Sequence, residues 1–192
     1  AIIFGGRHLE EDFQDCWILS LETPSWTAMP SQGNVPCGRF AHSGLILIDH
    51  FLIFGGFRQT ALFGTQHAPD VCAFNLHRKI WSLCLSEGTS PFINACASYG
   101  VQPCLKDALL VCGGCDRNFV PTNKVFYAKV TLLDDGRLKT SWSEVVCHGL
   151  APAPRQSHGF NAITPQSVLL FGGADWAGHK SGAGCKSYDD AH

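Results

Sequence analysis

An apolar run that ends in a pair of glycines occurs four times in this chain of 192 residues. The runs read IIFGG, FLIFGG, LLVCGG and VLLFGG, and their second glycines are 50, 58 and 59 residues apart. The paired glycines are Gly5, Gly6, Gly55, Gly56, Gly113, Gly114, Gly172 and Gly173. Self-similarity at a period of this size predicts a repeat architecture in which each copy forms one structural unit.

The residues between the glycine pairs repeat as well. A polar stretch follows each pair, and a short run of β-type residues then leads to a tryptophan, which is Trp26, Trp81 or Trp142 in the first three copies. β-Branched and aromatic residues bounded by Gly, Pro, Asn and Asp favour strands, and no segment keeps an apolar period of 3.6 residues. Each period therefore predicts about four strands and no helix.

A second motif, Arg-x-x-His after a proline-containing turn, occurs in two copies. It comprises Arg39 and His42 in one copy and Arg155 and His158 in the other. Because the two histidines recur at the same position of the repeat, we expect them to make a structural contact within the unit.

These glycine-pair strands, spaced tryptophans and Arg-x-x-His motifs resemble the Kelch repeat over nearly the whole chain. The resemblance implies an all-β fold, a partial Kelch-type β-propeller with two complete four-stranded blades and two incomplete blades. We expect a partial blade at 1–30, blades at 36–85 and 91–147, and a second partial blade at 154–192. The third copy departs from the pattern, with FINAC at 92–96 where Arg-x-x-His is expected and Cys112 before its glycine pair.

Single blades of this kind cannot bury both of their faces, so they must stack on their neighbours. A glycine pair suits a sharp turn beside an adjacent chain, and a tryptophan supplies a large apolar body between blades. We therefore expect the remaining blades to come from the same longer chain. Alone, the 192 residues would expose sheet edges and apolar faces and would aggregate.

The charge and hydropathy patterns argue against two classes of partner. The formal net charge is −2, and no run of Lys and Arg exceeds two residues, so the basic footprint of a nucleic-acid binder is missing. No apolar stretch approaches the roughly 18–20 residues that cross a bilayer. We expect neither nucleic acid nor membrane as a partner.

The ten cysteines indicate the redox state of the compartment in which the protein resides. Several lie inside apolar runs, among them Cys72 and Cys84, where a free thiol behaves as a small hydrophobic side chain. We expect a reducing compartment, the cytoplasm or the nucleus, with an extracellular module as the alternative.

Catalytic patterns are weak in this sequence. Cys112 and Cys115 form a C-x-x-C, but a zinc site needs a second ligand pair and a thioredoxin-like dithiol opens a helix, so we expect packing roles. Some Kelch propellers are enzymes, among them galactose-oxidase-like copper proteins and sialate mutarotases. Copper sites of the former type need Tyr and Cys together, and Tyr99, Tyr127 and Tyr188 lie in no recognisable ligand cluster. We expect no enzymatic activity, no metal and no cofactor.

Arginines recur at two positions of the repeat. Arg7, Arg58 and Arg117 each follow a glycine pair within three residues, while Arg39 and Arg155 belong to the Arg-x-x-His motif. In Kelch domains that serve as substrate receptors of ubiquitin ligases, arginines at these positions capture acidic groups, which suits the planar guanidinium fork. The alternative for the Arg-x-x-His arginines is a structural bond to the backbone or to acids of their own blade. The candidate partner-binding residues are Arg7, Arg39, Arg58, Arg117, Arg155 and Trp176.

The function predicted from this resemblance is protein interaction. The propeller would be the partner- or substrate-recognition domain of a larger protein, and its partner would present an acidic peptide or loop. One alternative is a structural subunit that holds the neighbours of a large assembly through broad surfaces. A Kelch-fold enzyme is the third hypothesis.

Overall fold

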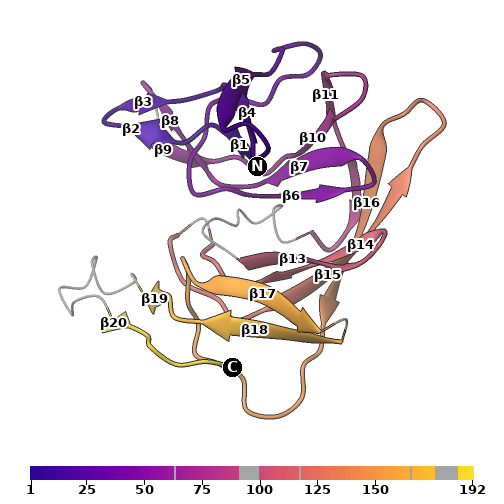
Figure 1. Ribbon diagram of the computed structural model, residues 1–192. Helices are drawn as coiled ribbons and strands as arrows, with labels where there is room; N and C mark the ends of the chain where they lie inside the picture. The colour runs from indigo at the N-terminus through magenta and orange to yellow at the C-terminus, as the bar shows by residue number, and fades with distance from the viewer. Residues whose placement is uncertain (63, 91–99, 117, 165, 176–185) are drawn as a thin grey trace.

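The computed structural model describes residues 1–62, 64–90, 100–116, 118–164, 166–175 and 186–192. These residues form strands, turns and loops without a helix, and so none of them makes a helix that could span a membrane. Four successive sheets, antiparallel except for one parallel pair in the third, lie in a stack (Figure 1). The all-β fold predicted from the repeat is confirmed.

The second sheet shows a complete blade. Its strands are β6 (Ser43–Leu47), β7 (His50–Phe54), β10 (Val71–Asn75) and β11 (Ile80–Leu83). They lie in the order β11-β10-β7-β6, and the hairpin that joins β7 to β10 lies outside this sheet. All five residues of β7 are buried, because β7 lies between two strands and the sheet lies between two others.

The first and fourth sheets contain fewer strands. The first comprises β1 (Ile2–Phe4), β4 (Cys16–Ser20) and β5 (Ser25–Ala28), in the order β1-β4-β5. The fourth comprises β17 (Gly159–Thr164) and β18 (Ser167–Phe171), and an isolated bridge joins Phe171 to Ala191.

The third sheet has one strand more than predicted. Its four expected strands are β13 (Gly100–Leu105), β14 (Ala108–Cys112), β15 (Val125–Leu132) and β16 (Leu138–Val145). A fifth strand, β12 (Leu85–Gly88), comes from the linker between the second and third sheets and pairs in parallel with β16. A linker that passes along the edge of β16 satisfies backbone groups that would otherwise face solvent.

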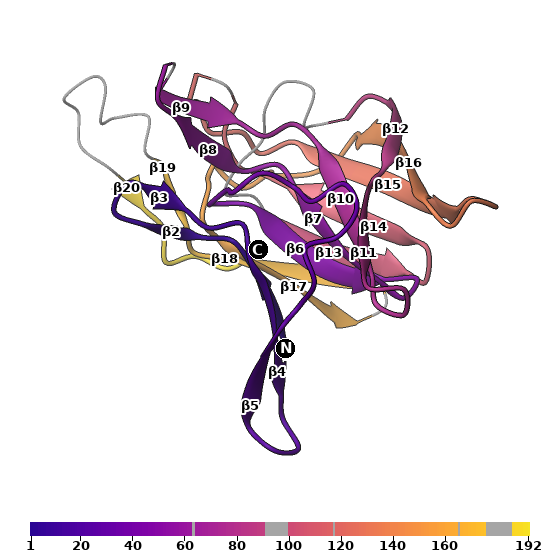
Figure 2. The ribbon, with the colours of Figure 1, turned by 90° about the horizontal axis from the view of Figure 1, so that it is seen from above.

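Three short hairpins extend from the stack on one side, as the front view and the view from above both show (Figure 1 and Figure 2). Their strands are β2 (Arg7–His8) with β3 (Glu11–Asp12), β8 (Phe57–Thr60) with β9 (Gly64–His67), and β19 (Ala174–Asp175) with β20 (Lys186–Ser187). Each hairpin begins directly after a glycine pair, so the repeat places equivalent loops on one face of the molecule.

Apolar side chains fill the spaces between successive sheets. Trp81 packs against Phe4 of the first sheet with a ring-centroid distance of 5.1 Å, and Trp142 packs against Phe54 of the second sheet at 6.3 Å. Both tryptophans lie between blades, as the sequence analysis expected of this position. Trp26 is 52% exposed, because no described element covers that side of β5.

The glycine pairs stand where the chain of an Arg-x-x-His motif passes very close. Gly56 has a φ of +88°, and a Cβ there would lie 2.6 Å from the carbonyl oxygen of Phe40. Gly113 has a φ of +68°, and its Cβ would lie 2.8 Å from the carbonyl oxygen of Arg155. Both the backbone conformation and the lack of space therefore require glycine.

Candidate functional site

The arginines of the two Arg-x-x-His motifs lie inside the stack. Arg39 is 0% exposed and Arg155 is 1% exposed. Arg39 donates through Nη1 to the carbonyl oxygen of Gly55 at 3.1 Å and through Nη2 to Oδ2 of Asp70 at 2.8 Å. A buried guanidinium whose donors are used in this way stabilises its own blade.

Arg155 repeats the arrangement in the fourth sheet. It donates through Nη1 to the carbonyl oxygen of Gly172 at 3.0 Å and through Nη2 to Oδ2 of Asp190 at 3.0 Å. The burial and internal hydrogen bonds of Arg39 and Arg155 favour the structural alternative over a role in partner binding, which stays a prediction. The arginine of the Arg-x-x-His motif therefore lies at the interface between two blades and is shielded from solvent.

The backbone of the same arginines joins each blade to the one before it. The carbonyl oxygen of Arg39 accepts from the amide of Gly6, and that of Arg155 accepts from the amide of Gly114, both at 2.9 Å. The side chain of each arginine thus bonds to the glycine pair of its own blade. Its backbone carbonyl bonds to the glycine pair of the preceding blade.

The third blade lacks the acidic partner as well as the motif. In the second and fourth blades, the residue whose carbonyl accepts from the first glycine of the pair is Asp70 or Asp190. In the third blade that residue is Lys124, whose Nζ lies 3.0 Å from Glu144. The sequence FINAC, which replaces the motif there, lies outside the described residues.

The motif histidines occupy the same interface. Burial, and next the nearby charge of Arg39, lower the pKa of His42 to about 4. Burial and the charge of Arg155 lower the pKa of His158 to about 4 as well. Both imidazoles are therefore neutral near pH 7, which suits a packing role between blades.

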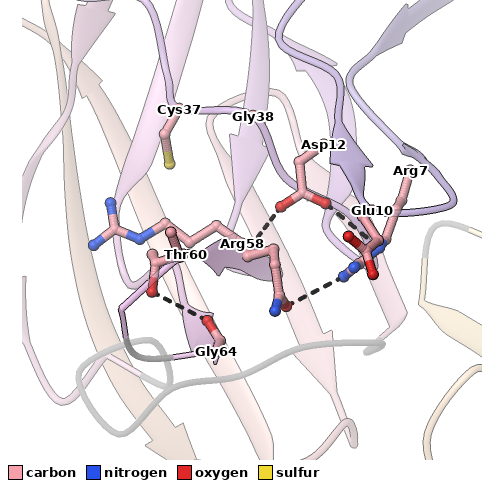
Figure 3. Close-up of a pocket in the computed structure, with 10 residues that line it drawn as sticks. Arg7, Glu10, Asp12, Cys37, Gly38, Arg58, Thr60 and Gly64 are labelled. Atoms are coloured by element: carbon pink, nitrogen blue, oxygen red, sulfur yellow. Dashed lines mark hydrogen bonds and ion pairs between the residues drawn. The ribbon is translucent and has the colours of Figure 1, made fainter.

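A cavity of about 730 Å³ lies between the hairpins β2–β3 and β8–β9, and we call it the hairpin pocket (Figure 3). Two of the predicted arginines, Arg7 and Arg58, line it. Its other lining residues are Glu10, Asp12, Cys37, Gly38, Gln59, Thr60, Ala61 and Gly64. The repeat thus brings two equivalent loops of adjacent blades together around one cavity.

Arg7 is held by the residues around it. Its Nε donates to the carbonyl oxygen of Leu9 at 2.8 Å and lies 3.8 Å from Oδ1 of Asp12. Its guanidinium carbon lies 4.9 Å from the ring centroid of Phe40, within the range of a cation–π contact. Arg7 is therefore paired with a carboxylate and stacked on a ring before any partner arrives.

Arg58 differs from Arg7 in having no carboxylate within ion-pair distance among the described residues. Its Nη2 donates to Oε1 of Gln66 at 3.4 Å, at the long end of the hydrogen-bond range. Its Nε is buried and has no hydrogen-bond partner among those residues. Figure 3 shows its guanidinium at one end of the pocket, with Glu10, Asp12 and Arg7 at the other.

An aromatic cluster lies beside the pocket and joins the loops of the second and third blades. Phe57 stacks on Phe119 with a centroid distance of 5.2 Å and an interplanar angle of 20°, and contacts Phe40 and His67. Cys115 packs in the same cluster. The hairpin that carries Arg58 is therefore anchored at its base by the buried ring of Phe57 and the half-buried rings around it.

Two predicted site residues, Arg117 and Trp176, lie outside the described residues. The C-x-x-C cysteines are buried, with Cys112 5% and Cys115 1% exposed. Burial raises the pKa of Cys112 to about 11, so its thiol stays protonated at neutral pH. Among the described residues, no group of three or more His, Cys, Asp and Glu could hold a metal ion.

Sequence reasoning missed the acidic side of the hairpin pocket. Glu10 and Asp12 belong to the loop after the first glycine pair, and Oδ2 of Asp12 accepts from the backbone amide of Gln59 in the neighbouring hairpin. No motif marks these two acids, and their place in the pocket of Arg58 depends on how the two adjacent blades stack.

Comparison with known proteins identifies the family. The sequence model of the KLHDC2/KLHL20/DRC7 Kelch-repeats domain matches residues 1–192, so the chain belongs to this family of Kelch-repeat proteins.

Two curated relatives show how the chain relates to longer proteins. The chain is 25% identical over 181 residues to tip elongation aberrant protein 1 of Schizosaccharomyces pombe, covering 91% of this chain and 15% of that protein. It is 27% identical over 137 residues to Kelch domain-containing protein 2 of Bos taurus, covering 69% of this chain and 31% of that protein. The chain therefore spans less than a third of the length of these relatives.

Proposed function

We propose that this chain is a protein-binding segment of a Kelch propeller, and that its hairpin pocket takes an acidic group of the partner at Arg58. The observation that carries the proposal is the state of Arg58. It lines a 730 Å³ pocket, its Nε is buried, and it has no carboxylate partner among the described residues. A partner carboxylate would supply the bidentate acceptor that this fork lacks.

The surroundings of Arg58 support a preformed site. Phe57 precedes Arg58 in β8 and is 5% exposed within the aromatic cluster, so the backbone beneath the guanidinium is fixed before binding. Preorganisation of this kind lowers the entropic cost of association. Kelch domains commonly mediate protein binding, which agrees with this use of the loops.

The hairpin pocket also restricts which acidic groups fit. Glu10 and Asp12 lie at the end away from the Arg58 guanidinium, so a ligand that is acidic throughout would be repelled there. The pocket therefore favours a peptide with one acidic side chain for Arg58 and a neutral or basic neighbour toward Glu10.

We further propose that the chain binds without catalysis in a reducing compartment such as the cytoplasm. The described cysteines support the compartment, since Cys16, Cys37, Cys72, Cys84, Cys112, Cys115 and Cys147 are all free thiols. Burial raises the pKa of Cys72 well above its usual range and that of Cys84 to about 12, so both thiols stay protonated near neutral pH.

The test is affinity capture with the full-length protein that contains this chain. Arg58→Glu is compared with Arg78→Glu, a charge reversal at an exposed arginine in the turn between β10 and β11. We expect Arg58→Glu to remove specific partners that wild type and Arg78→Glu both retain, with unchanged thermal stability. Equal recovery of every partner by the two variants would remove Arg58 from the interface.

A further inference from the structure

A free thiol lies in the wall of the hairpin pocket. Cys37 belongs to the loop between β5 and β6 and lines the pocket. Among the described cysteines, Cys37 is partly exposed and Cys147 is exposed, whereas the other five are buried. Figure 3 shows the side chain of Cys37 directed toward that of Arg58. The pocket thus combines a thiol that solvent can reach with a guanidinium that lacks a carboxylate partner among the described residues.

The fold does not require a sulfur atom at this position. The carbonyl oxygen of Cys37 accepts from Nε of Arg39 at 3.3 Å, and that of Ala153 accepts from Nε of Arg155 at 3.1 Å. Cys37 and Ala153 each stand two residues before the arginine of their motif. Because alanine serves in the fourth blade, the motif uses the backbone of this residue and leaves the thiol available for another role.

The loop holds the thiol beside a positive charge. A Cβ on Gly38 would lie 2.4 Å from the carbonyl oxygen of Asp12, so the backbone after Cys37 is packed tightly against the first hairpin. Nη2 of the buried Arg39 donates to Sγ of Cys37 at 3.4 Å. A guanidinium in this place stabilises the negative charge that the sulfur carries when it reacts.

Two further polar atoms of the pocket point to a charged ligand. The side chain of Asp12 is 8% exposed, and its Oδ1 has no hydrogen-bond partner among the described residues, with Nε of Arg7 3.8 Å away. Nε of Arg58 is also buried without such a partner. Because unsatisfied buried groups are costly, these two atoms favour a ligand that carries both a donor and a carboxylate. The cavity of about 730 Å³ is of a size typical for small-molecule sites.

We propose that Cys37 is a modification site, at which the hairpin pocket binds glutathione and the thiol forms a mixed disulfide with it. Glutathione is a short peptide with carboxylates at both ends, an ammonium beside one of them, and a thiol between. Its glycine carboxylate would pair with Arg58. Its ammonium would face Glu10 and Asp12, and the neighbouring carboxylate would face Arg7 at the same end of the pocket.

The mixed disulfide forms by exchange with glutathione disulfide. The thiolate of Cys37 attacks one sulfur of the reagent, so that a new S–S bond forms as the old one breaks. The second half of the reagent leaves as a thiolate and takes up the proton that Cys37 lost. Cys37 is oxidised and the leaving glutathione is reduced, so no other oxidant is needed. Excess reduced glutathione reverses the step.

The mixed disulfide would regulate binding, because it occupies Arg58 and fills the cavity around it. A partner that presents an acidic side chain would then be excluded until the disulfide is reduced. This loss of binding rests on the function proposed for Arg58, whereas the modification of Cys37 does not.

The modification is tested on the full-length protein with glutathione disulfide, and mass spectrometry of the peptides gives the rate at each cysteine. The exposed Cys147 is the control thiol in the same molecule. We expect Arg58→Gln to lower the ratio of the Cys37 rate to the Cys147 rate at least about fivefold. With cystamine, a disulfide that carries ammonium groups and no carboxylate, the substitution should not lower this ratio. No modification of Cys37, or an unchanged ratio with glutathione disulfide, would overturn the proposal.

The regulation is tested by affinity capture after the same treatment. Wild type should lose the partners that Arg58→Glu loses, and dithiothreitol should restore them. Cys37→Ser, which keeps a small acceptor near Arg39, should retain its partners throughout. Modified Cys37 with undiminished capture would overturn the regulatory claim, whereas retention of every partner by untreated Arg58→Glu would contradict the proposed function of Arg58 itself.

Discussion

The guanidinium group of Arg39 donates to the carboxylate of Asp70 at 2.8 Å from a position with no solvent exposure. Burial alone would raise the pKa of Asp70, but the hydrogen bond and charge of Arg39 hold that pKa below its usual range. Because the backbone of Arg39 also bonds to Gly6, one residue connects two blades. Arg155 makes the equivalent contacts, so this connection between blades is a feature of the repeat.

Removing this guanidinium should destabilise the fold strongly. We expect Arg39→Gln to lower the free energy of unfolding by about 3 kcal/mol, because it leaves the carboxylate of Asp70 and a buried carbonyl without their donor. Arg39→Lys should recover little, since an ammonium cannot reproduce the fork. Urea unfolding of the full-length protein measures both, with the exposed Arg78→Gln as control. A loss below about 0.5 kcal/mol for Arg39→Gln would contradict the structural role.

Alanine substitutions at two glycines distinguish the energetic cost of a positive φ from the cost of a steric clash at Cβ. Gly6 and Gly56 both have positive φ, but a Cβ at Gly6 meets nothing within 4 Å, whereas one at Gly56 would lie 2.6 Å from the carbonyl oxygen of Phe40. We expect Gly6→Ala to cost about 1 kcal/mol for conformation alone. Gly56→Ala should cost clearly more by thermal unfolding, and equal losses would show that the backbone at Phe40 yields.

The motif histidines should make stability depend on pH. The pKa of His42 in the folded protein is about 4, below its unfolded value of about 6.5, so the unfolded state binds more protons between these values. The stabilisation is complete above pH 6.5 and is lost as the pH falls toward 4. Between pH 7 and 5 we expect a loss of up to about 2 kcal/mol per histidine.

Urea titrations at pH 7, 6 and 5 measure this loss. His42→Gln should unfold with a shallower pH dependence than wild type, and His77→Gln, at a side chain that is 77% exposed, serves as the control. The same pH dependence in all three proteins would show that His42 is not responsible.

The 192 residues expressed alone should not behave as a stable monomer. Trp26, Ile163 and Phe171 are 52%, 62% and 54% exposed on the first and fourth sheets, and exposed apolar faces of this kind promote association. We expect aggregates or broad, concentration-dependent peaks in size-exclusion chromatography. A sharp monomer peak with cooperative unfolding would contradict this expectation.

The sequence predicted the blades because their determinants are local and periodic. Gly56 needs positive φ and a free Cβ position, and Trp81 needs a large apolar space, so neither tolerates many substitutions and both recur visibly. The added strand β12 escaped prediction because parallel pairing of a linker depends on the position of β16, 54 residues away in the chain.

The candidate site was harder to predict because the same guanidinium chemistry serves both a structural ion pair and the binding of a partner. Arg39 and Arg58 both stand in motifs that recur, and a fork that pairs with a partner's carboxylate also pairs with Asp70. Only the burial of the side chain distinguishes the structural Arg39 from Arg58, and this burial depends on how the blades stack. The co-occurrence of Arg39 with Asp70 and of Arg155 with Asp190, absent together from the third blade, was the available signal.

A charge-swap binding experiment tests whether Arg58 binds an acidic side chain of the partner. A peptide from a captured partner is titrated against full-length wild type, Arg58→Glu and Arg78→Glu by fluorescence anisotropy. We predict that Arg58→Glu raises the Kd at least about tenfold, that Arg78→Glu leaves it unchanged, and that changing the peptide's acidic residue to lysine restores binding to Arg58→Glu. An unchanged Kd for Arg58→Glu would contradict the account.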